Sequence, residues 1–299
     1  MSAVPDAFQR YGAESLAQAP AFGPGKDGVF EATLVRADGR DTRLLRDYTK
    51  VPYHLTGTLD TDPVPGLTTL CLQEPTGGVA QGDRHSITVT AREGARARVT
   101  TQSATKVHSM QANYAHLDAT LEAGPDAHLE YVPGPTIVNE DARCLQTVAV
   151  DLAPSATVVV ADVFVPGGLS AHEPFDFDHY HSRLEARCEE RLVCADAVDL
   201  HPADGDPRDP ATVAEYDVVG TLYVLAPEAD TEALAEAIHD RFGAHDAVTA
   251  GVSALPYESG VSVRVLGTRS ADVTDAVWDA WDASRQELLG VGVPADRRY

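Results

Sequence analysis

The chain has 299 residues, enough for one large domain or two ordinary ones with a sizeable core. Its formal net charge is −23, from 46 acidic and 23 basic residues, and no basic stripe is visible, which excludes a nucleic-acid partner. It contains no run of 18 apolar residues, which excludes a transmembrane helix and a membrane partner of that kind.

The acidic charge is spread along the whole chain, and the only lysines are Lys26, Lys50 and Lys106. This distribution favours a halophilic protein adapted to a salt-filled cytoplasm, because concentrated salt screens self-repulsion while carboxylates keep the surface hydrated. The alternative is a dedicated acidic patch for a cationic partner. The first residues lack the basic and apolar regions of a signal peptide, so we expect a cytoplasmic location. The four cysteines form no CxxC pair and are expected to be reduced thiols.

The first 200 residues predict β structure. Residues 1–28, rich in Ala, Pro and Gly, are expected to form a loose N-terminal lead. In HSITVT (85–90) and GARARVTT (94–101), apolar and polar residues alternate as in half-buried strands. The strand patterns continue at 29–37, 127–132, 144–152, 156–165, 179–188 and 191–200. We therefore predict a β-rich body over 29–200, for which a parallel stack, a sandwich and a distorted β-helix all stay open on pattern alone.

The last third changes character after an acidic, proline-rich loop at 201–212. Leu234, Ile238 and Phe242 recur at helical spacing, and Asp230 stands where an N-cap is needed. We predict a small α+β unit over 213–299, packed on the body. Its expected elements are a strand at 216–227, a helix at 230–243, a strand at 261–267 and a helix at 270–290.

The most metal-like stretch is HEPFDFDHYH (172–181). On a strand, His179 and His181 point to the same face, as a chelating pair requires, and imidazole suits nickel, zinc and copper. The alternative is a pair of surface histidines on a solvated strand.

No motif of nucleophilic or zinc-dependent hydrolysis is present, neither GxSxG nor HExxH. The glycines of PTGGVAQGD (75–83) lack the spacing of a nucleotide-binding loop and favour a turn with positive φ. The polar run VTTQSATKVHSMQ (99–111) suits strand-to-strand hydrogen bonding or a wet polar wall. The residues alone therefore indicate a β-rich protein without an evident active site.

Three motifs follow one another along the chain: GGVAQGD (77–83), VTTQSATKV (99–107) and LEYVPGPTI (129–137). In this order they resemble the urease accessory protein D family, called H in some organisms. LLRDYTKVPYHLTGTL (44–59) lies where the family has an early strand, and the resemblance runs from about residue 30 to 200, with weaker agreement to the end. The chain departs from the family's GR-x-x-x-GE segment at GGLSAHE (167–173). There Glu173 matches, but Gly168 and His172 replace the usual Arg and Gly.

The resemblance implies a mainly β fold, a distorted, helix-like stack of strands with helices at one side. It implies a urease maturation factor without its own turnover, a chaperone-like scaffold that assists nickel insertion during metallocenter assembly. Such proteins bind a helical accessory protein, F, recruit a nickel-binding GTPase, G, and dock on the urease structural subunits. We therefore expect no tightly bound cofactor and only transiently bound nickel. We also expect an internal polar tunnel for the metal. A homodimer within the complex stays open.

The resemblance assigns the tunnel or an interface to twelve motif residues: Gly77, Gly78, Gly82, Asp83, Thr100, Thr101, Gln102, Thr105, Lys106, Glu130, Tyr131 and Pro133. Transient metal contacts are expected at Glu173, His179, His181 and His172, because weak sites suit metal transfer better than a closed four-ligand site. Two other functions stay open. One is a metal-dependent β-fold enzyme using residues 172–181, and the other is a salt-adapted binding module without a metal role.

Overall fold

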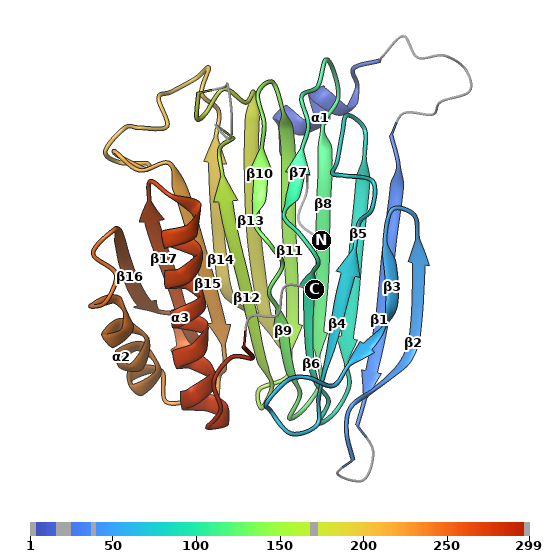
Figure 1. The fold of residues 1–299 in the computed structure, drawn as a ribbon, viewed down its shortest axis with the longest axis vertical. Coiled ribbons are helices and arrows are strands. Elements are labelled where there is room, and N and C mark those ends of the chain that lie inside the picture. Colours follow the sequence, from blue (N-terminus) through green and yellow to red (C-terminus); the bar gives the residue numbers. More distant parts are fainter. Residues whose placement is uncertain (1–3, 16–24, 37–39, 168–172, 296–299) are drawn as a thin grey trace.

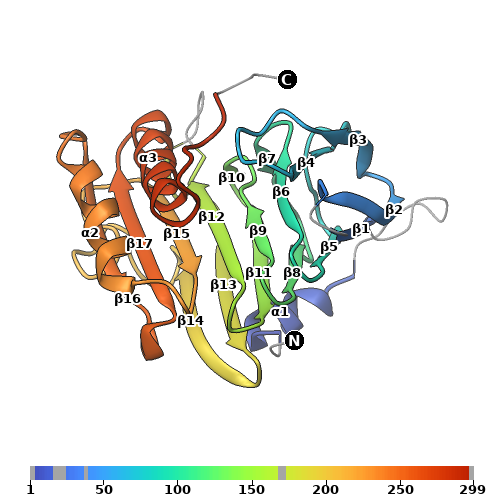
Figure 2. The same cartoon turned by 90° about the horizontal axis from the view of Figure 1, so that it is seen from below.

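The computed structural model describes residues 4–15, 25–36, 40–167 and 173–295, and they form two layers of β-sheet with helices on the outer faces. Figure 1 shows the strands of both layers running along the long axis, and Figure 2 shows α3 and α1 on opposite sides of the two layers. The expectation of a β-rich stack with a C-terminal helical part is confirmed.

The first layer is a seven-stranded sheet. Its strands, in spatial order, are β14 (Arg191–Leu200), β13 (His179–Cys188), β11 (Arg143–Leu152), β8 (Ala115–Ala123), β5 (Arg84–Ala91), β1 (Asp27–Val35) and β2 (Arg43–Lys50). The five strands from β13 to β1 are parallel to their neighbours, while β14 and β2 pair antiparallel at the two edges.

The second layer is a ten-stranded sheet. Its main path is β16 (Val248–Ala254), β17 (Gly260–Gly267), β15 (Val218–Leu225), β12 (Thr157–Val165), β9 (His128–Tyr131), β6 (Arg96–Thr101), β4 (Leu67–Gln73) and β3 (His54–Leu59). The short strands β7 (Thr105–Val107) and β10 (Thr136–Val138) pair with each other, and β10 also pairs with β12. From β4 to β13 the chain alternates between the two sheets, apart from the short strands β7 and β10, which follow β6 and β9 in the same sheet, and this alternation produces stacked coils.

Strand alternation explains the main core between the sheets. On β5, every second side chain is buried, beginning with His85 and continuing through Ile87 and Val89. The parallel register then places equivalent positions side by side across the sheet. One buried row consists of Phe30, Ile87, Ala119, Val148 and Leu184. The period-2 pattern therefore fixes which side chains enter the space between the sheets.

The C-terminal segment extends the ten-stranded sheet, because β15 pairs antiparallel with β12. The helices α2 (Thr231–Phe242) and α3 (Ser270–Leu289) pack on this sheet, with Leu234, Ile238 and Trp281 buried beneath them. The Asp230 carboxylate accepts hydrogen bonds from the Glu232 and Ala233 amides at 3.1 and 3.0 Å, so the predicted N-cap is confirmed. A 3-10 turn, η1 (Pro256–Glu258), joins β16 to β17. The division of the chain into domains stays a prediction.

Part of the predicted loose lead is ordered. Helix α1 (Asp6–Gly12) lies on the outer face of the seven-stranded sheet, where the Phe8 side chain is fully buried beside Tyr114 and His179. Within the described residues, no helix has both the length and the apolar character needed to cross a membrane.

A buried group of charges connects α3 to the ten-stranded sheet. The Arg285 guanidinium lies 2.5 Å from an Asp62 oxygen and 3.5 Å from a Glu130 oxygen, and all three side chains are inaccessible to solvent. Arg98 approaches Asp62 at 3.7 Å, and His128 lies 2.8 Å from Glu130. Buried carboxylates need such partners, because desolvation otherwise disfavours their charged form.

We predict that Arg285→Met lowers the free energy of unfolding by about 3–5 kcal/mol, since it removes the one arginine that pairs with both buried carboxylates. Arg241→Met removes the partly exposed pair with Asp282, at 3.1 Å, and serves as the matched control. Its cost should stay below about 1 kcal/mol. Urea unfolding in molar KCl, followed by tryptophan fluorescence, measures both values, and equal losses would contradict the assigned role of Arg285.

Candidate functional site

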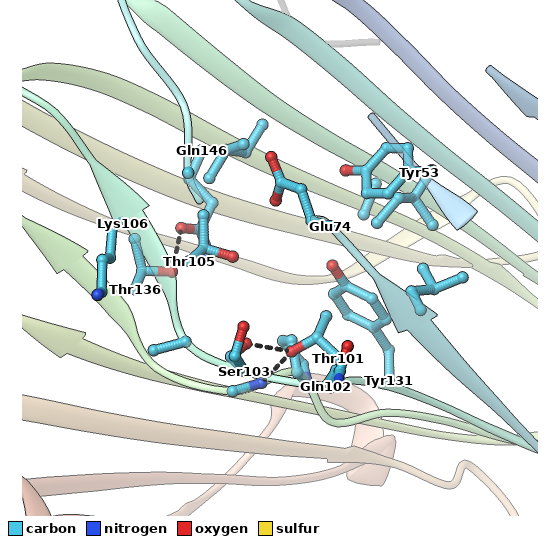
Figure 3. A pocket seen from close by; sticks show the side chains of 18 of the residues that line it. Tyr53, Glu74, Thr101, Gln102, Ser103, Thr105, Lys106, Tyr131, Thr136 and Gln146 are labelled. Atoms are coloured by element: carbon cyan, nitrogen blue, oxygen red, sulfur yellow. Dashed lines mark hydrogen bonds between the residues drawn. The ribbon is translucent and has the colours of Figure 1, made fainter. Parts of the chain in front are cut away.

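A cavity of about 290 Å³ lies between the two sheets, near the point where β6 passes into β7. Both sheets contribute to its wall: β4, β6 and β9 from one side, and β5, β8 and β11 from the other. Figure 3 shows Tyr53, Glu74 and Tyr131 directed toward a shared space, with Gln146 beyond them. The wall is therefore mixed, with aliphatic residues of the main core on one side and polar groups on the other.

The polar run at 101–106 bends around one end of this cavity. The Thr101 hydroxyl donates to the Ser103 carbonyl oxygen at 2.9 Å and accepts from the Gly134 amide at 2.8 Å. Farther along, Thr136 donates to Gln146 across the sheets at 3.4 Å (Figure 3). Internal bonds thus fix the bend, while Gln102, Ser103 and Lys106 stay exposed to solvent at this end of the cavity.

The glycine-rich turn at 75–83 forms the adjacent part of the cavity wall through Gly77 and Gly78. A Cβ atom on Gly78 would lie 2.3 Å from the Lys106 carbonyl oxygen, so only glycine lets the turn approach this strand. The adjoining Val79 amide donates to the same oxygen at 2.8 Å. Gly78 therefore holds the turn against the end of the polar run.

Asp83 fixes the other end of the turn from a buried position. Its two oxygens accept from the Lys26 amide at 2.7 Å and the Ala80 amide at 2.9 Å, and the Lys26 ammonium lies 3.3 Å away. Asp83 therefore satisfies one backbone donor of the turn and one of the segment that leads into β1. Asp83 lies beside the cavity wall and is not part of it.

Desolvation dominates the electrostatics of the wall. Burial raises the pKa of Glu74 above its usual range, and it raises the pKa of Tyr131 strongly. His85 projects inward from β5 in the row next to Ile87, and burial lowers its pKa to about 4. At neutral pH its imidazole is uncharged and retains a lone pair.

A smaller cavity of about 30 Å³ continues the polar interior, and Gln146 and Val148 line both cavities. It contains the partly buried Asp162, whose pKa is raised by burial and which accepts from the Tyr180 hydroxyl at 3.4 Å. The polar interior therefore extends from the glycine turn toward β13 and β14.

Eight of the twelve motif residues assigned by resemblance line the larger cavity: Gly77, Gly78, Thr101, Gln102, Thr105, Lys106, Tyr131 and Pro133. Gly82 and Asp83 belong to the adjacent turn, and Thr100 lies on β6 outside the lining. Glu130 faces away from the cavity, toward Arg285. Glu74, His85 and Gln146 were not singled out from sequence, although their positions in the strand alternation place them on the inner face.

The histidine-rich stretch lies elsewhere, on the outer face of the seven-stranded sheet. His179 is buried beside α1, where Nε2 lies 2.7 Å from an Asp199 oxygen and Nδ1 lies 3.3 Å from the Tyr11 hydroxyl. His181 Nδ1 lies 3.3 Å from the same Asp199 oxygen, while Glu173 is exposed. His172 and Gly168 fall outside the described residues. Across the described part of the chain, no group of three or more His, Cys, Asp or Glu is arranged to hold a metal ion.

The stacked strands and the motif-lined cavity define a β-structured protein whose sequence motifs build a polar interior. The chain belongs to the UreD urease accessory protein family, whose family model matches residues 26–298. It is thus a member of a family of urease maturation factors, as the resemblance predicted.

Individual relatives agree over nearly the whole chain. The chain is 96% identical over 299 residues to the urease accessory protein UreD of Natronomonas pharaonis, covering 100% of both chains. It is 60% identical over 295 residues to the Haloquadratum walsbyi protein of the same name, covering 99% of this chain and 97% of the relative. The Mycolicibacterium gilvum urease accessory protein UreD is 34% identical over 274 residues, covering 91% and 97%.

Adding a methyl group to each of the two adjacent glycines of the turn tests how the turn is held. Gly77 has a φ of +82° with open space around its Cβ position, whereas Gly78 meets backbone. We expect Gly77→Ala to lower the free energy of unfolding by about 1–2 kcal/mol from backbone strain alone. Gly78→Ala should lower it by roughly 3–5 kcal/mol, because the clash adds to the strain. Urea unfolding compares them, and a cost at Gly77 equal to that at Gly78 would refute the close approach to Lys106.

Proposed function

We propose that this protein is a cytoplasmic scaffold for urease maturation, without its own turnover, and that nickel passes through its polar interior on the way to apo-urease. The observation that carries the proposal is the convergence of the family motifs on one cavity. Motif residues distant in sequence, such as Gly78, Thr105 and Tyr131, line the same space. A purely structural role for these motifs would not require a shared polar cavity between the sheets.

The chemistry of the interior supports passage of a cation. Gln146 lines both cavities and joins the wall around Glu74 to the region around Asp162. Carboxylate and amide oxygens can replace water around a divalent ion one contact at a time, without enclosing it in a tight site. Scattered oxygen donors suit a transient cargo better than four convergent ligands would.

The partners in this proposal are the urease structural subunits, the F accessory protein and the nickel-binding GTPase G, with a homodimer within the complex as a further proposal. Family membership supports the association with urease maturation. Transient metal contacts are also proposed for Glu173, His172, His179 and His181. Those at His179 and His181 would lie on a separate surface, the outer face of the seven-stranded sheet against α1.

The test is co-expression of urease subunits with the F and G proteins, with and without a tagged copy of this chain, in molar KCl. We expect the tagged chain to co-purify with urease and the two accessory proteins. Omission of the chain should remove most of the nickel from purified urease, measured by elemental analysis together with urease activity. Full nickel loading in its absence would overturn the proposed function.

The interior route is tested by the double variant Thr105→Val and Gln146→Met, which removes two polar groups from the wall at nearly constant volume. We expect nickel in urease to fall several-fold while the variant still co-purifies with its partners. Thr120 lies on β8 next to the cavity residue Ala119 and faces the other side of the sheet, so Thr120→Val is the matched control and should leave nickel loading unchanged. Equal loading with the double variant and with wild type would argue against the interior route.

A further inference from the structure

The side chains of Glu74 and His85 meet across the space between the sheets. His85 lies on the inner face of β5, two residues before the core residue Ile87. Glu74 follows β4 two residues after the core residue Leu72, and it lines the large cavity. The Glu74 Oε1 atom lies 3.6 Å from His85 Nδ1. A carboxylate from one sheet therefore faces an imidazole from the other.

These facing atoms lack hydrogen-bond partners. Within the described part of the chain, Glu74 Oε1 and both ring nitrogens of His85 are buried without a partner. The His85 side chain is only 1% exposed and that of Glu74 only 17%. Unpaired buried polar atoms are uncommon in folded proteins and point to an additional ligand or to a shift of the groups.

The two neighbouring charged groups, Lys26 and Asp83, already have other partners. The Lys26 ammonium lies 3.3 Å from each of Asp83 Oδ2, Thr76 Oγ1 and the Gly78 carbonyl oxygen. Both Asp83 oxygens accept backbone amides of the turn. Neither group is therefore available as the main partner of the Glu74–His85 pair.

Packing fixes the imidazole in place. A Cβ atom on Gly28 would lie 3.0 Å from the His85 ring and 2.7 Å from Pro52, so glycine at this position permits the close contact. The Tyr53 ring stands edge-on to His85, with the centroids 5.4 Å apart. The donor nitrogen is held by its surroundings before any ligand arrives, which lowers the entropic cost of binding.

The separation of the two atoms suits a metal ion. An ion about 2.1 Å from each atom would span 3.6 Å with an angle of about 120° at the metal, close to tetrahedral. A water about 2.8 Å from each atom would need an angle of only about 80°, which is poor for hydrogen bonding.

We propose that Glu74 and His85 form an open, two-ligand site for a divalent transition-metal ion at the edge of the large cavity, which Glu74 lines and His85 adjoins, with water in the remaining coordination positions. The mixed nitrogen and oxygen donors select ions such as nickel, cobalt or zinc over calcium and magnesium, which prefer oxygen alone. The inference rests on the proposed function only for its cargo, nickel. Two protein ligands hold an ion without trapping it.

The test uses the purified full chain in molar KCl, titrated with NiCl₂ by isothermal calorimetry and with CoCl₂ by visible absorption. We expect Glu74→Gln and His85→Gln each to weaken binding at least about tenfold. His116→Gln, which alters a histidine bonded to Thr147 at 2.9 Å, is the matched control and should change affinity by less than about twofold.

A measurement on wild-type protein avoids any dependence on variant folding. Substoichiometric Co²⁺ should shift and broaden the imidazole NMR signals of His85 before those of His179 or His181. Unchanged metal affinity in both cavity variants, or early perturbation of His179 alone, would overturn the site. If the site fails while urease loading still requires this chain, the proposed function stands. If the site binds metal but urease loading does not require the chain, the proposed function fails instead.

Discussion

The in-register pairing of parallel strands is the constraint on which the rest of this structure depends. Because side chains alternate along a strand, one register decides the contents of every row between the sheets. The row of Phe30, Ile87, Ala119, Val148 and Leu184 is apolar. The next inward-facing row contains Gly28, His85, Leu117, Gln146 and Ser182. The interior therefore changes from an apolar row to a row that includes polar side chains over two residues along each strand.

The same constraint explains how the fold tolerates charge in its interior. Burying an unpaired carboxylate is costly, and the protein meets this cost differently on the two faces of the ten-stranded sheet. On the helical face, Asp62 and Glu130 have the Arg285 guanidinium as a permanent partner. On the cavity face, burial raises the pKa of Glu74 and of Asp162, and no arginine forms an equivalent clamp with Glu74 in the described residues. The carboxylates on the helical face therefore have a fixed arginine partner that stabilises the fold, whereas the Glu74 carboxylate at the cavity has no such partner among the described residues.

The sequence alone predicts much of the fold but less of the site. Alternation in 85–90 and the helical stripe after Asp230 identify their elements, because both patterns are local. The strands β2 and β16 are harder to recognise, since Arg43–Lys50 and Val248–Ala254 are largely exposed and lack a clear apolar face. The motifs locate the cavity, yet Glu130 and Tyr131 show the limit of that inference. These adjacent residues point to opposite faces of β9, so only Tyr131 lines the cavity.

Cross-sheet neighbours are the part that sequence cannot supply. Glu74 and His85 come from different sheets, and nothing in their local patterns predicts an approach of 3.6 Å.

The buried position of this pair bears on how such an acidic chain could select a metal. With a net charge of −23, the surface attracts every cation, but at about 1 M salt the Debye length is about 3 Å and long-range steering is lost. Selection must then come from short-range ligand chemistry in the interior. There an imidazole nitrogen discriminates against the abundant alkali ions that an acidic surface cannot reject.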